Sequence, residues 1–382
     1  MSCYCNNAGR TSACHRQAKN LAPAEGEPAD LAGRAMVASF GPYQSAQERE
    51  ELMKQVRFSA FGTPEEVAEC VEVEGVGAPG PDEVVIEMEA FPINPADLLT
   101  ITGGYAVRPK LPATLGAEGV GRISAVGSDV KGLAPGQRVI NLGRDNWCQQ
   151  RKVPAAQVLK MPADADVMQL AMLKVNPATA LLMLRNYVDL QPGDWVIQDA
   201  ANSGVGTNLI RLAKADGIQT VNVVRRESLI RPLEASGADV VVVDGEDLAG
   251  QVREKTGGAP IKLAIDAIGG EIVMRLADCL AESGTVVNYG LLSGKPCMLG
   301  AHHTIFKGIT LTGFWLQKAL STMARPDLEK LYGDLAERVR TGALKVEVEK
   351  TYPIEEIKAA LAHARREGRS GKILVLPNGP LD

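Results

Sequence analysis

A glycine turn between an expected strand and an expected helix is the feature of this sequence best suited to hold a nucleotide. Gly204 and Gly206 follow the apolar run "DWVIQDA" and precede the helical pattern "VGTNLIRLAKADG". Small residues in such a turn let backbone N–H groups at a helix N-terminus approach a pyrophosphate. We therefore expect Asn202, Ser203 and Val205 to bind the cofactor together with the two glycines.

Two arginines, Arg225 and Arg226, end the next apolar run, "TVNVVRR". Arg225 lies 19 residues after Gly206, at the carboxyl end of the second expected strand. A site that prefers NAD has Asp or Glu at this place, whereas a basic residue accommodates the 2′-phosphate of NADP. The planar guanidinium can donate two hydrogen bonds to phosphate. The pattern predicts NADPH, and the alternative is that both arginines are solvated loop residues.

The segments that must position this turn alternate between strand and helix. Five apolar runs between Trp195 and Thr312 are separated by stretches about one helix long, which predicts a doubly wound parallel Rossmann sheet. From Met53 to about residue 160, short alternating runs are punctuated by Gly and Pro, which indicates a mostly β, barrel-like module. A helical pattern over residues 169–188 is interrupted at Pro177. The fold class is therefore α/β.

The composition excludes several classes of protein. The 382 residues are enough for two domains, and a net charge of −5 argues against broad nucleic-acid binding. No run approaches the ~20 apolar residues of a membrane span. Seven cysteines, the last four of them scattered singly, are typical of reduced thiols in a cytoplasmic enzyme.

Residues 1–52 differ from the rest because they have no apolar periodicity, and we expect a disordered extension there. Arg10, Arg16 and Lys19 precede the first acidic residue, Glu25. A transit peptide is therefore the alternative interpretation, and the protein would then be mitochondrial rather than cytoplasmic.

The succession of a β module, a Rossmann domain and a return to the first module resembles the medium-chain dehydrogenase/reductase superfamily. This resemblance implies that the β module is a GroES-like catalytic domain. Zinc-dependent members carry an early Cys, a Gly-His-Glu motif and a cysteine cluster. Here residues 116–118 read Gly-Ala-Glu, and no cysteine cluster follows. We expect the following limits: extension 1–52, first part of the catalytic domain 53–177, Rossmann domain 178–318, and return to the catalytic domain 319–382.

His302 and His303 are the remaining candidates for a metal site. As neighbours on a strand they would point to opposite sides, and no Cys or carboxylate is expected to pair with them. Without thiolate or imidazole ligands at a workable spacing, a catalytic zinc ion is not expected. We therefore expect no metal site.

Longer stretches narrow the resemblance further. The strings "NPADLLTITGGYAVRP", "VNPATALLML", "ANSGVG", "TVNVVRR" and "IFKGITLTGFWL" look like mitochondrial-type trans-2-enoyl-CoA/acyl-carrier-protein reductases and their bacterial relatives. The resemblance spans about residues 53–376. It implies NADPH-dependent reduction of the carbon–carbon double bond of a 2-enoyl thioester, a step of fatty acid metabolism. Two stretches depart from the family pattern. The second basic residue of "VVRRES" should change the geometry of phosphate recognition but not abolish it, and the loop around Trp147 and Cys148 is expected to reshape the substrate mouth.

The same resemblance implies a set of catalytic residues. Tyr105 matches the family's proposed proton donor, and Trp315 matches a tryptophan near the nicotinamide, with Phe314 and Leu316 beside the cofactor. Asn94 matches a position near the substrate. Each has a simpler structural alternative: a packing tyrosine, a core tryptophan and a helix cap, respectively.

Four further residues are expected to contact the cofactor. Asn176 in "VNP" matches a residue near the nicotinamide ribose, and Tyr289 and Gly290 end the fifth Rossmann strand, where the chain should pass the nicotinamide. Lys372 matches a lysine that reaches the cofactor, and its alternative is a surface charge before the last strand.

Two competing functions remain at this point. A zinc-independent NADPH:quinone or enone reductase would use the same hydride geometry on a smaller acceptor, and a non-catalytic NADPH- or RNA-binding protein could keep the fold. The expected partner under the leading hypothesis is a small-molecule or carrier-bound acyl thioester. A homodimer is also expected, because "TLTGFWL" would leave an apolar strand at a sheet edge.

Overall fold

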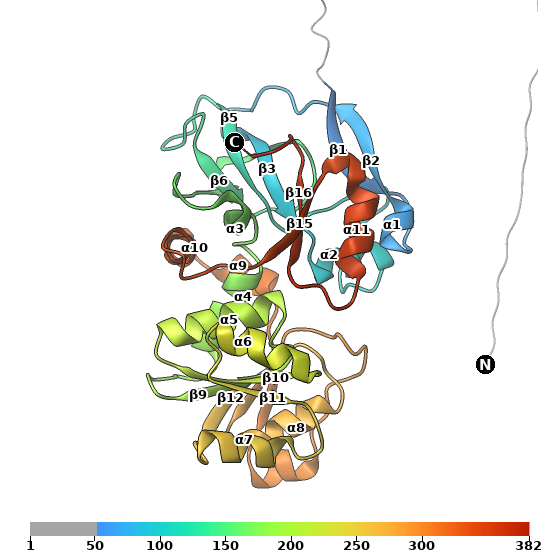
Figure 1. Ribbon diagram of the computed structural model, residues 1–382. Coiled ribbons are helices and arrows are strands. Elements are labelled where there is room, and N and C mark those ends of the chain that lie inside the picture. Colours follow the sequence, from blue (N-terminus) through green and yellow to red (C-terminus); the bar gives the residue numbers. More distant parts are fainter. Residues whose placement is uncertain (1–51, 382) are drawn as a thin grey trace, which may run out of the picture. The chain divides into compact units, whose positions relative to one another are not determined.

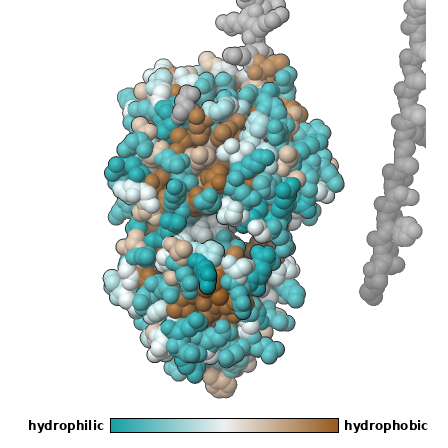
Figure 2. All heavy atoms as spheres, viewed as in Figure 1, coloured by the Kyte–Doolittle hydropathy of each residue, from teal (hydrophilic) through white to brown (hydrophobic). Residues whose placement is uncertain are grey.

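The computed structural model describes residues 52–381 of the chain, so the extension expected before Leu52 lies outside the described part. Among the described helices, none is long and apolar enough to cross a membrane. Figure 2 shows hydrophilic residues interspersed with hydrophobic ones over the viewed face.

The Rossmann part is a six-stranded sheet in which every pairing is parallel (Figure 1). The strand order is β11-β10-β9-β12-β13-β14, so the first strand lies in the middle and the chain winds outward in both directions. This is the order of a doubly wound dinucleotide-binding fold. The strands are β9 (Trp195–Gln198), β10 (Gln219–Val224), β11 (Val240–Val243), β12 (Ile261–Asp266), β13 (Thr285–Asn288) and β14 (Thr310–Gly313).

Amphipathic helices link these strands. In α5, Leu209, Ile210 and Leu212 are buried on one side while Lys214 is exposed. Such a stripe with period 3.6 packs on a sheet because its apolar side leaves water. The helical segments of this part are α5 (Gly204–Ala215), η2 (Glu227–Leu229), α6 (Ile230–Ala235), α7 (Leu248–Thr256), α8 (Ile272–Cys279) and η3 (His302–Phe306).

The β-rich part contains a seven-stranded sheet and a three-stranded sheet. Its C-terminal strand β16 pairs antiparallel with β3, so the end of the chain returns to the first module (Figure 1). The larger sheet has the order β15-β16-β3-β5-β6-β8, with β7 on β3, and the smaller has the order β2-β1-β4. The bounds are β1 (Leu52–Phe58), β2 (Ala68–Glu74), β3 (Glu83–Pro92), β4 (Ala113–Thr114), β5 (Val120–Val126), β6 (Arg138–Asn141), β7 (Gln150–Pro154), β8 (Val158–Lys160), β15 (Val348–Pro353) and β16 (Lys372–Leu376).

The helices of the β-rich part and of the connections between the parts are mostly short. They are α1 (Pro64–Val67), α2 (Pro95–Thr102), η1 (Ala155–Gln157), α3 (Val167–Ala171), α4 (Asn176–Asn186), α9 (Leu316–Thr322), α10 (Arg325–Arg340), η4 (Ile354–Glu356) and α11 (Ile357–Arg365). Together the two parts confirm the expected α/β class. The residues at which one domain passes into the next stay a prediction.

Local details refine the expectations. The helical pattern over residues 169–188 is interrupted next to Pro177, because α3 ends at Ala171 and α4 begins at Asn176. Pro177 lies in the first turn of α4, where its missing N–H costs no hydrogen bond. The sixth strand ends at Gly313, so Trp315 and Leu316 lie outside it. Trp147 and Cys148 are both fully buried, and the Trp147 ring stacks on Phe91 at 5.7 Å between centroids. The expected difference at the substrate mouth stays a prediction.

Candidate active site

Tyr105 and Trp315 meet although 210 positions separate them. The indole Nε1 of Trp315 donates a hydrogen bond to the Tyr105 hydroxyl at 3.1 Å. Tyr105 follows α2, which ends at Gly103 in the left-handed conformation (φ 74°), and Trp315 immediately precedes α9. Trp315 is 42% exposed, so it is not a core tryptophan. Because the indole N–H occupies one lone pair of the hydroxyl oxygen, the Tyr105 proton remains free to be donated to another group.

Asn94 forms the centre of a buried polar network. Its backbone N–H and side chain exchange hydrogen bonds with Asp97 in a capping box at the start of α2, so the cap interpretation holds. The side chain also reaches outward: Nδ2 donates to Glu118 Oε1 at 2.7 Å. Oδ1 accepts hydrogen bonds from Lys372 Nζ at 2.6 Å and from Asn176 Nδ2 at 3.3 Å. Three of the expected site residues are thus joined, and Lys372 is not a surface charge.

Glu118 is a functional candidate that the motif analysis missed. Its Oε2 accepts a hydrogen bond from the backbone N–H of Val175 at 2.7 Å, just before α4. Burial raises the pKa of Glu118 to about 7, although the hydrogen bond from Asn94 and the charge of Lys372 both oppose the rise. Burial likewise lowers the pKa of Lys372 to about 8. The Gly-Ala-Glu string was read only for its missing histidine, whereas an acidic residue between apolar strands was the available signal.

Lys174 is a second buried cation beside this network. Its Nζ donates to the carbonyl oxygens of Ala117 and Gly143, both at 2.6 Å. Burial lowers the pKa of Lys174 to about 8, and the negative charge of Glu118 partly offsets this effect. Perturbed titratable groups that cluster in this way are typical of functional sites.

The glycine turn adjoins the same network. Ser203 caps α5, and its Oγ accepts a hydrogen bond from Gly206 N at 3.1 Å. A Cβ atom added at Gly206 would lie 2.5 Å from the Ala201 carbonyl oxygen, and one added at Gly204 would lie 2.9 Å from Lys372 Cε. The N-terminus of α5 and the ammonium of Lys372 therefore present positive potential at one place, which suits a pyrophosphate. In the same turn Asn202 is exposed and Val205 is buried.

The carboxyl ends of β13 and β14 supply the other expected cofactor residues. A Cβ added at Gly290 would lie 2.5 Å from the Ala267 carbonyl oxygen, so this close approach requires glycine. Burial raises the pKa of Tyr289, and a hydrogen bond with Ser203 opposes the rise. Phe314 N donates to Asn288 O at 2.8 Å, and the side chains of Phe314 and Leu316 are partly buried.

Arg225 and Arg226 lie directly after β10, as expected, and both are exposed. Within residues 52–381, the only ion pair of Arg225 is a 3.5 Å contact with Glu367, and both side chains are largely exposed. An exposed pair of this kind holds a side chain weakly. Arg225 is therefore free to turn toward a phosphate, and its part in cofactor binding stays a prediction.

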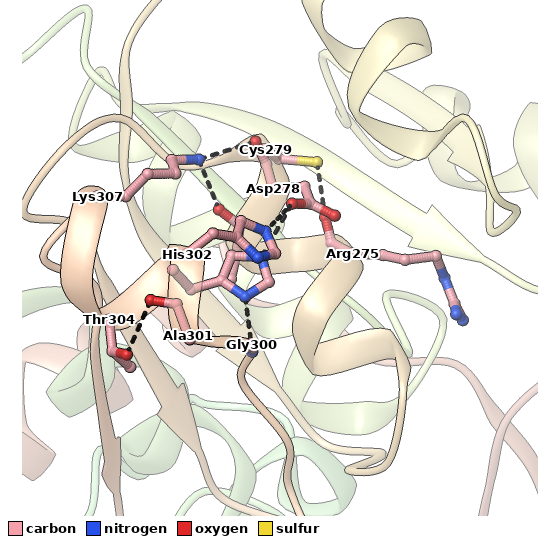
Figure 3. A network of polar contacts seen from close by, with 10 residues as sticks. Arg275, Asp278, Cys279, Gly300, Ala301, His302, Thr304 and Lys307 are labelled. Atoms are coloured by element: carbon pink, nitrogen blue, oxygen red, sulfur yellow. Dashed lines mark hydrogen bonds and ion pairs between the residues drawn. The ribbon is translucent and has the colours of Figure 1, made fainter.

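The description of His302 and His303 as opposite-facing strand residues was wrong. Both lie in the turn η3, where backbone curvature brings the two imidazole rings to 3.7 Å between centroids. Their Nε2 atoms lie 3.3 and 2.9 Å from the same oxygen of Asp278 (Figure 3). Gly300 N donates to Nδ1 of His303 at 2.9 Å, which leaves the ring proton on Nε2, facing the carboxylate. This geometry fits a hydrogen-bonded triad that ties the loop to α8.

Comparisons with known proteins agree with this architecture. Residues 80–164 match the family described as "Alcohol dehydrogenase GroES-like domain", and residues 204–333 match the family "Zinc-binding dehydrogenase". The fold, the two matches and Ala117 in place of the histidine ligand define a zinc-free medium-chain dehydrogenase/reductase.

More specific similarity comes from individual proteins. The mitochondrial enoyl-(acyl-carrier-protein) reductase of Homo sapiens is 33% identical over 96% of this chain and 98% of its own length, and that of Arabidopsis thaliana is 36% identical over 81% and 84%. The chain belongs to this enoyl reductase family. Among solved structures, a mitochondrial 2-enoyl thioester reductase heterodimer from Candida tropicalis matches with a TM-score of 0.78, at 25% identity over 86% of this chain and 100% of that one. A protein from Bacillus thuringiensis described as a putative NADPH:quinone reductase matches with a TM-score of 0.80, at 29% identity over 86% and 99%.

Proposed function

We propose that this protein reduces the C2=C3 double bond of a trans-2-enoyl thioester, carried on coenzyme A or acyl carrier protein, to the saturated acyl thioester with NADPH as reductant. The observation that carries the proposal is the Tyr105–Trp315 hydrogen bond, which holds the Tyr105 hydroxyl beside the carboxyl end of β14. The family membership of the chain supports the same reaction.

The reaction makes two demands on the protein. NADPH, when bound, supplies a hydride for Cβ, and negative charge then develops on the thioester oxygen. The Tyr105 hydroxyl is the donor available to stabilise that oxygen, with Trp315 fixing its orientation, and such a preorganised donor is worth about 3 kcal/mol in the transition state. A proton delivered to Cα completes the reduction. Asn94 and Lys372, held together by their hydrogen bond, are placed to orient the reductant rather than to react.

NADPH is preferred over NADH in this proposal because of Arg225 and Arg226. Neither guanidinium is buried, and neither follows an acidic residue that would bind a ribose 2′-hydroxyl. A solved structure described as a complex of Etr1p with NADP and crotonyl-CoA is 25% identical to this chain, with a TM-score of 0.77, and its cofactor supports this choice.

The decisive experiment follows the absorbance of the reduced nicotinamide with crotonyl-CoA as substrate. Parallel reactions contain NADH in place of NADPH, or a simple quinone in place of the thioester. Rapid oxidation of NADPH by crotonyl-CoA, with little from NADH, is the expected result. If NADPH is oxidised only when the quinone is present, the protein is instead a zinc-independent NADPH:quinone or enone reductase. The similarity to the Bacillus thuringiensis protein favours this alternative.

We also propose that the protein is a homodimer joined at β14. This strand is the edge of the six-stranded sheet, and Leu311 on it is 37% exposed. Ile305 and Phe306, which lie shortly before it, are 70% and 79% exposed. An uncovered apolar edge is a liability in a monomer. Sedimentation of the wild type and of Leu311→Lys is the test: a dimer converted to a monomer is expected, and a monomeric wild type would refute the proposal.

The compartment depends on the extension before Leu52. The names of the relatives include "mitochondrial", which supports a transit peptide in residues 1–52, and the alternative remains cytoplasmic. Fusion of residues 1–52 to a fluorescent protein tests the choice: import into mitochondria supports the transit peptide, and diffuse fluorescence supports the alternative.

A further inference from the structure

Two aspartates lie buried at the carboxyl ends of the two central Rossmann strands. Asp199 directly follows β9, and Asp266 is the last residue of β12. Their exposed fractions are 1% and 0%. Strands β9 and β12 flank the point where the strand order reverses, which is where doubly wound sheets bind their ligands. Neither aspartate has a part in the chemistry described above.

The hydrogen bonds of the two carboxyl groups differ. Oδ1 of Asp266 accepts from the backbone N–H groups of Ile268 (3.0 Å) and Gly269 (2.9 Å), and Oδ2 accepts from Asn288 Nδ2 at 2.5 Å. Oδ1 of Asp199 accepts from Ala267 N at 2.7 Å. The other oxygen of Asp199 is buried without a donor. Asp199 N donates to Ile265 O at 3.1 Å, so the hydrogen bonds of Asp199 reach the residues on both sides of Asp266, and the Asp266 carboxyl group is its neighbour.

Two facing carboxyl groups in a dry interior cannot both be ionised. All the hydrogen bonds to Asp266 suit a carboxylate, whereas the buried Oδ2 of Asp199 is satisfied only if it carries a proton and donates it to Asp266. Burial and the neighbouring Asp266 both raise the pKa of Asp199.

The other titratable groups around the pair do not offset this arrangement. Asp244 adds negative charge, and its own partner is Arg275, which donates to it at 2.6 and 2.8 Å. Tyr289 and the thiol of Cys297 also face the pair, and the pKa of each is raised, mainly by burial. None of these groups supplies a cation that would stabilise a second carboxylate.

We propose that Asp199 and Asp266 share one proton beneath the cofactor crevice, and that loss of this proton weakens the binding of the anionic NADPH. The proposal rests on the proposed function only in naming NADPH as the ligand. The hydrogen bond made by the shared proton connects the turn after β9 to the turn after β12. Asn288, which donates to both Asp266 Oδ2 and Gly290 O, extends the tie to the loop of Tyr289 and Gly290. Asp199 is therefore a positioning residue for the cofactor.

The sign of the pH dependence follows from linkage. Because the pKa of Asp199 is higher in the folded protein than in the unfolded chain, the stabilising contribution is present at low pH and is lost as pH rises through the folded pKa. Since NADPH is anionic, ionisation of the pair adds repulsion in the same pH range. Proton and cofactor thus bind with positive coupling, and by reciprocity NADPH binding takes up protons there.

Asp199→Asn is the diagnostic variant because an amide reproduces the protonated acid: Oδ1 can accept from Ala267 N while Nδ2 donates to Asp266. The dissociation constant for NADPH and the melting temperature are measured from acidic to alkaline pH. The melting temperature of the wild type is expected to fall as pH rises toward the folded pKa, and its affinity for NADPH to fall by up to about tenfold per pH unit above that pKa. In Asp199→Asn the part of each trend that follows the titration of Asp199 disappears, whereas the loss of affinity from deprotonation of Lys372, whose pKa burial lowers to about 8, remains.

Asp266→Asn provides the matched comparison. Its amide would set an N–H group against the donor Asn288 Nδ2, so a lower melting temperature at every pH is expected. Parallel pH curves for the wild type and Asp199→Asn, or equal damage from the two substitutions, would overturn the shared proton. The melting curves are recorded without cofactor, so a failure of crotonyl-CoA reduction would refute the function and leave this inference standing.

Discussion

The substitution Glu118→Gln is expected to separate stability from cofactor binding. In the folded protein burial raises the pKa of Glu118 from 4.5 to about 7. The difference between these two pKa values corresponds to about 3 kcal/mol of differential free energy. Since the folded pKa is the higher one, the contribution of Glu118 to stability is present below pH 4.5 and declines as pH rises to about 7.

Glutamine cannot titrate, so this decline should be absent from the variant. At low pH the variant should be less stable than the wild type by about 1–3 kcal/mol, because one of the two donors, Asn94 Nδ2 or Val175 N, faces an amide N–H. Near neutral pH the difference should shrink to about zero or reverse, since the wild type then holds a buried carboxylate.

The same substitution should weaken the binding of NADPH at neutral pH. The negative charge of Glu118 raises the pKa of Lys372, which burial lowers to about 8. Without that charge Lys372 loses its proton more readily, and positive potential beside Gly204 falls. The dissociation constant for NADPH at neutral pH should therefore rise by about tenfold, the equivalent of one charge-assisted contact.

Denaturant unfolding at several pH values and titration with NADPH measure the two effects. Glu89→Gln is the control, because Glu89 on β3 accepts hydrogen bonds from Arg138 on β6 and takes no part in the Asn94 network. The NADPH affinity of this control should match that of the wild type. Parallel stability curves for the wild type and Glu118→Gln would refute the electrostatic reasoning. Unchanged NADPH affinity in Glu118→Gln would refute the inference that the charge of Glu118 keeps Lys372 protonated for cofactor binding.

Three further predictions concern single groups of the site. Tyr105→Phe should lower kcat for crotonyl-CoA by about 10²–10³-fold while the KM for NADPH stays within about twofold, and steady-state kinetics that show an unchanged kcat would remove Tyr105 from the mechanism. Arg225→Asp should raise the KM for NADPH by about 10–100-fold and the KM for NADH much less. The control Arg253→Asp, on the exposed side of α7, should change neither KM. Equal effects of Arg225→Asp on the two KM values would exclude recognition of the 2′-phosphate by Arg225. Gly206→Ala should lower the melting temperature and abolish NADPH binding, because its Cβ would lie 2.5 Å from Ala201 O, and a fully active variant would show that the turn can open without cost.

Local sequence was sufficient for the Rossmann part because its signals are local. Each strand expected from an apolar run is present, and the glycine turn begins α5 as anticipated. Arg225 directly follows β10 because a strand ends where its apolar run ends. Boundaries shifted where a signal had two meanings. Pro177 breaks a helix in its interior but favours the first turn, and only the position of the helix start distinguishes the two.

The residues that can act together were decided by the tertiary structure. Asn94, Glu118 and Lys372 come from three separate segments and meet because β3 pairs with both β5 and β16. Their shifted pKa values arise from burial, which no local pattern encodes. Periodicity likewise placed His302 on a strand, whereas the chain curves there and presents its ring to Asp278 on α8. Sequence alone therefore established the fold class and the glycine turn that begins α5, because both depend on contacts between residues near in the chain. Burial and the pairing of distant segments, which depend on the packed structure, determined which side chains meet at the candidate site.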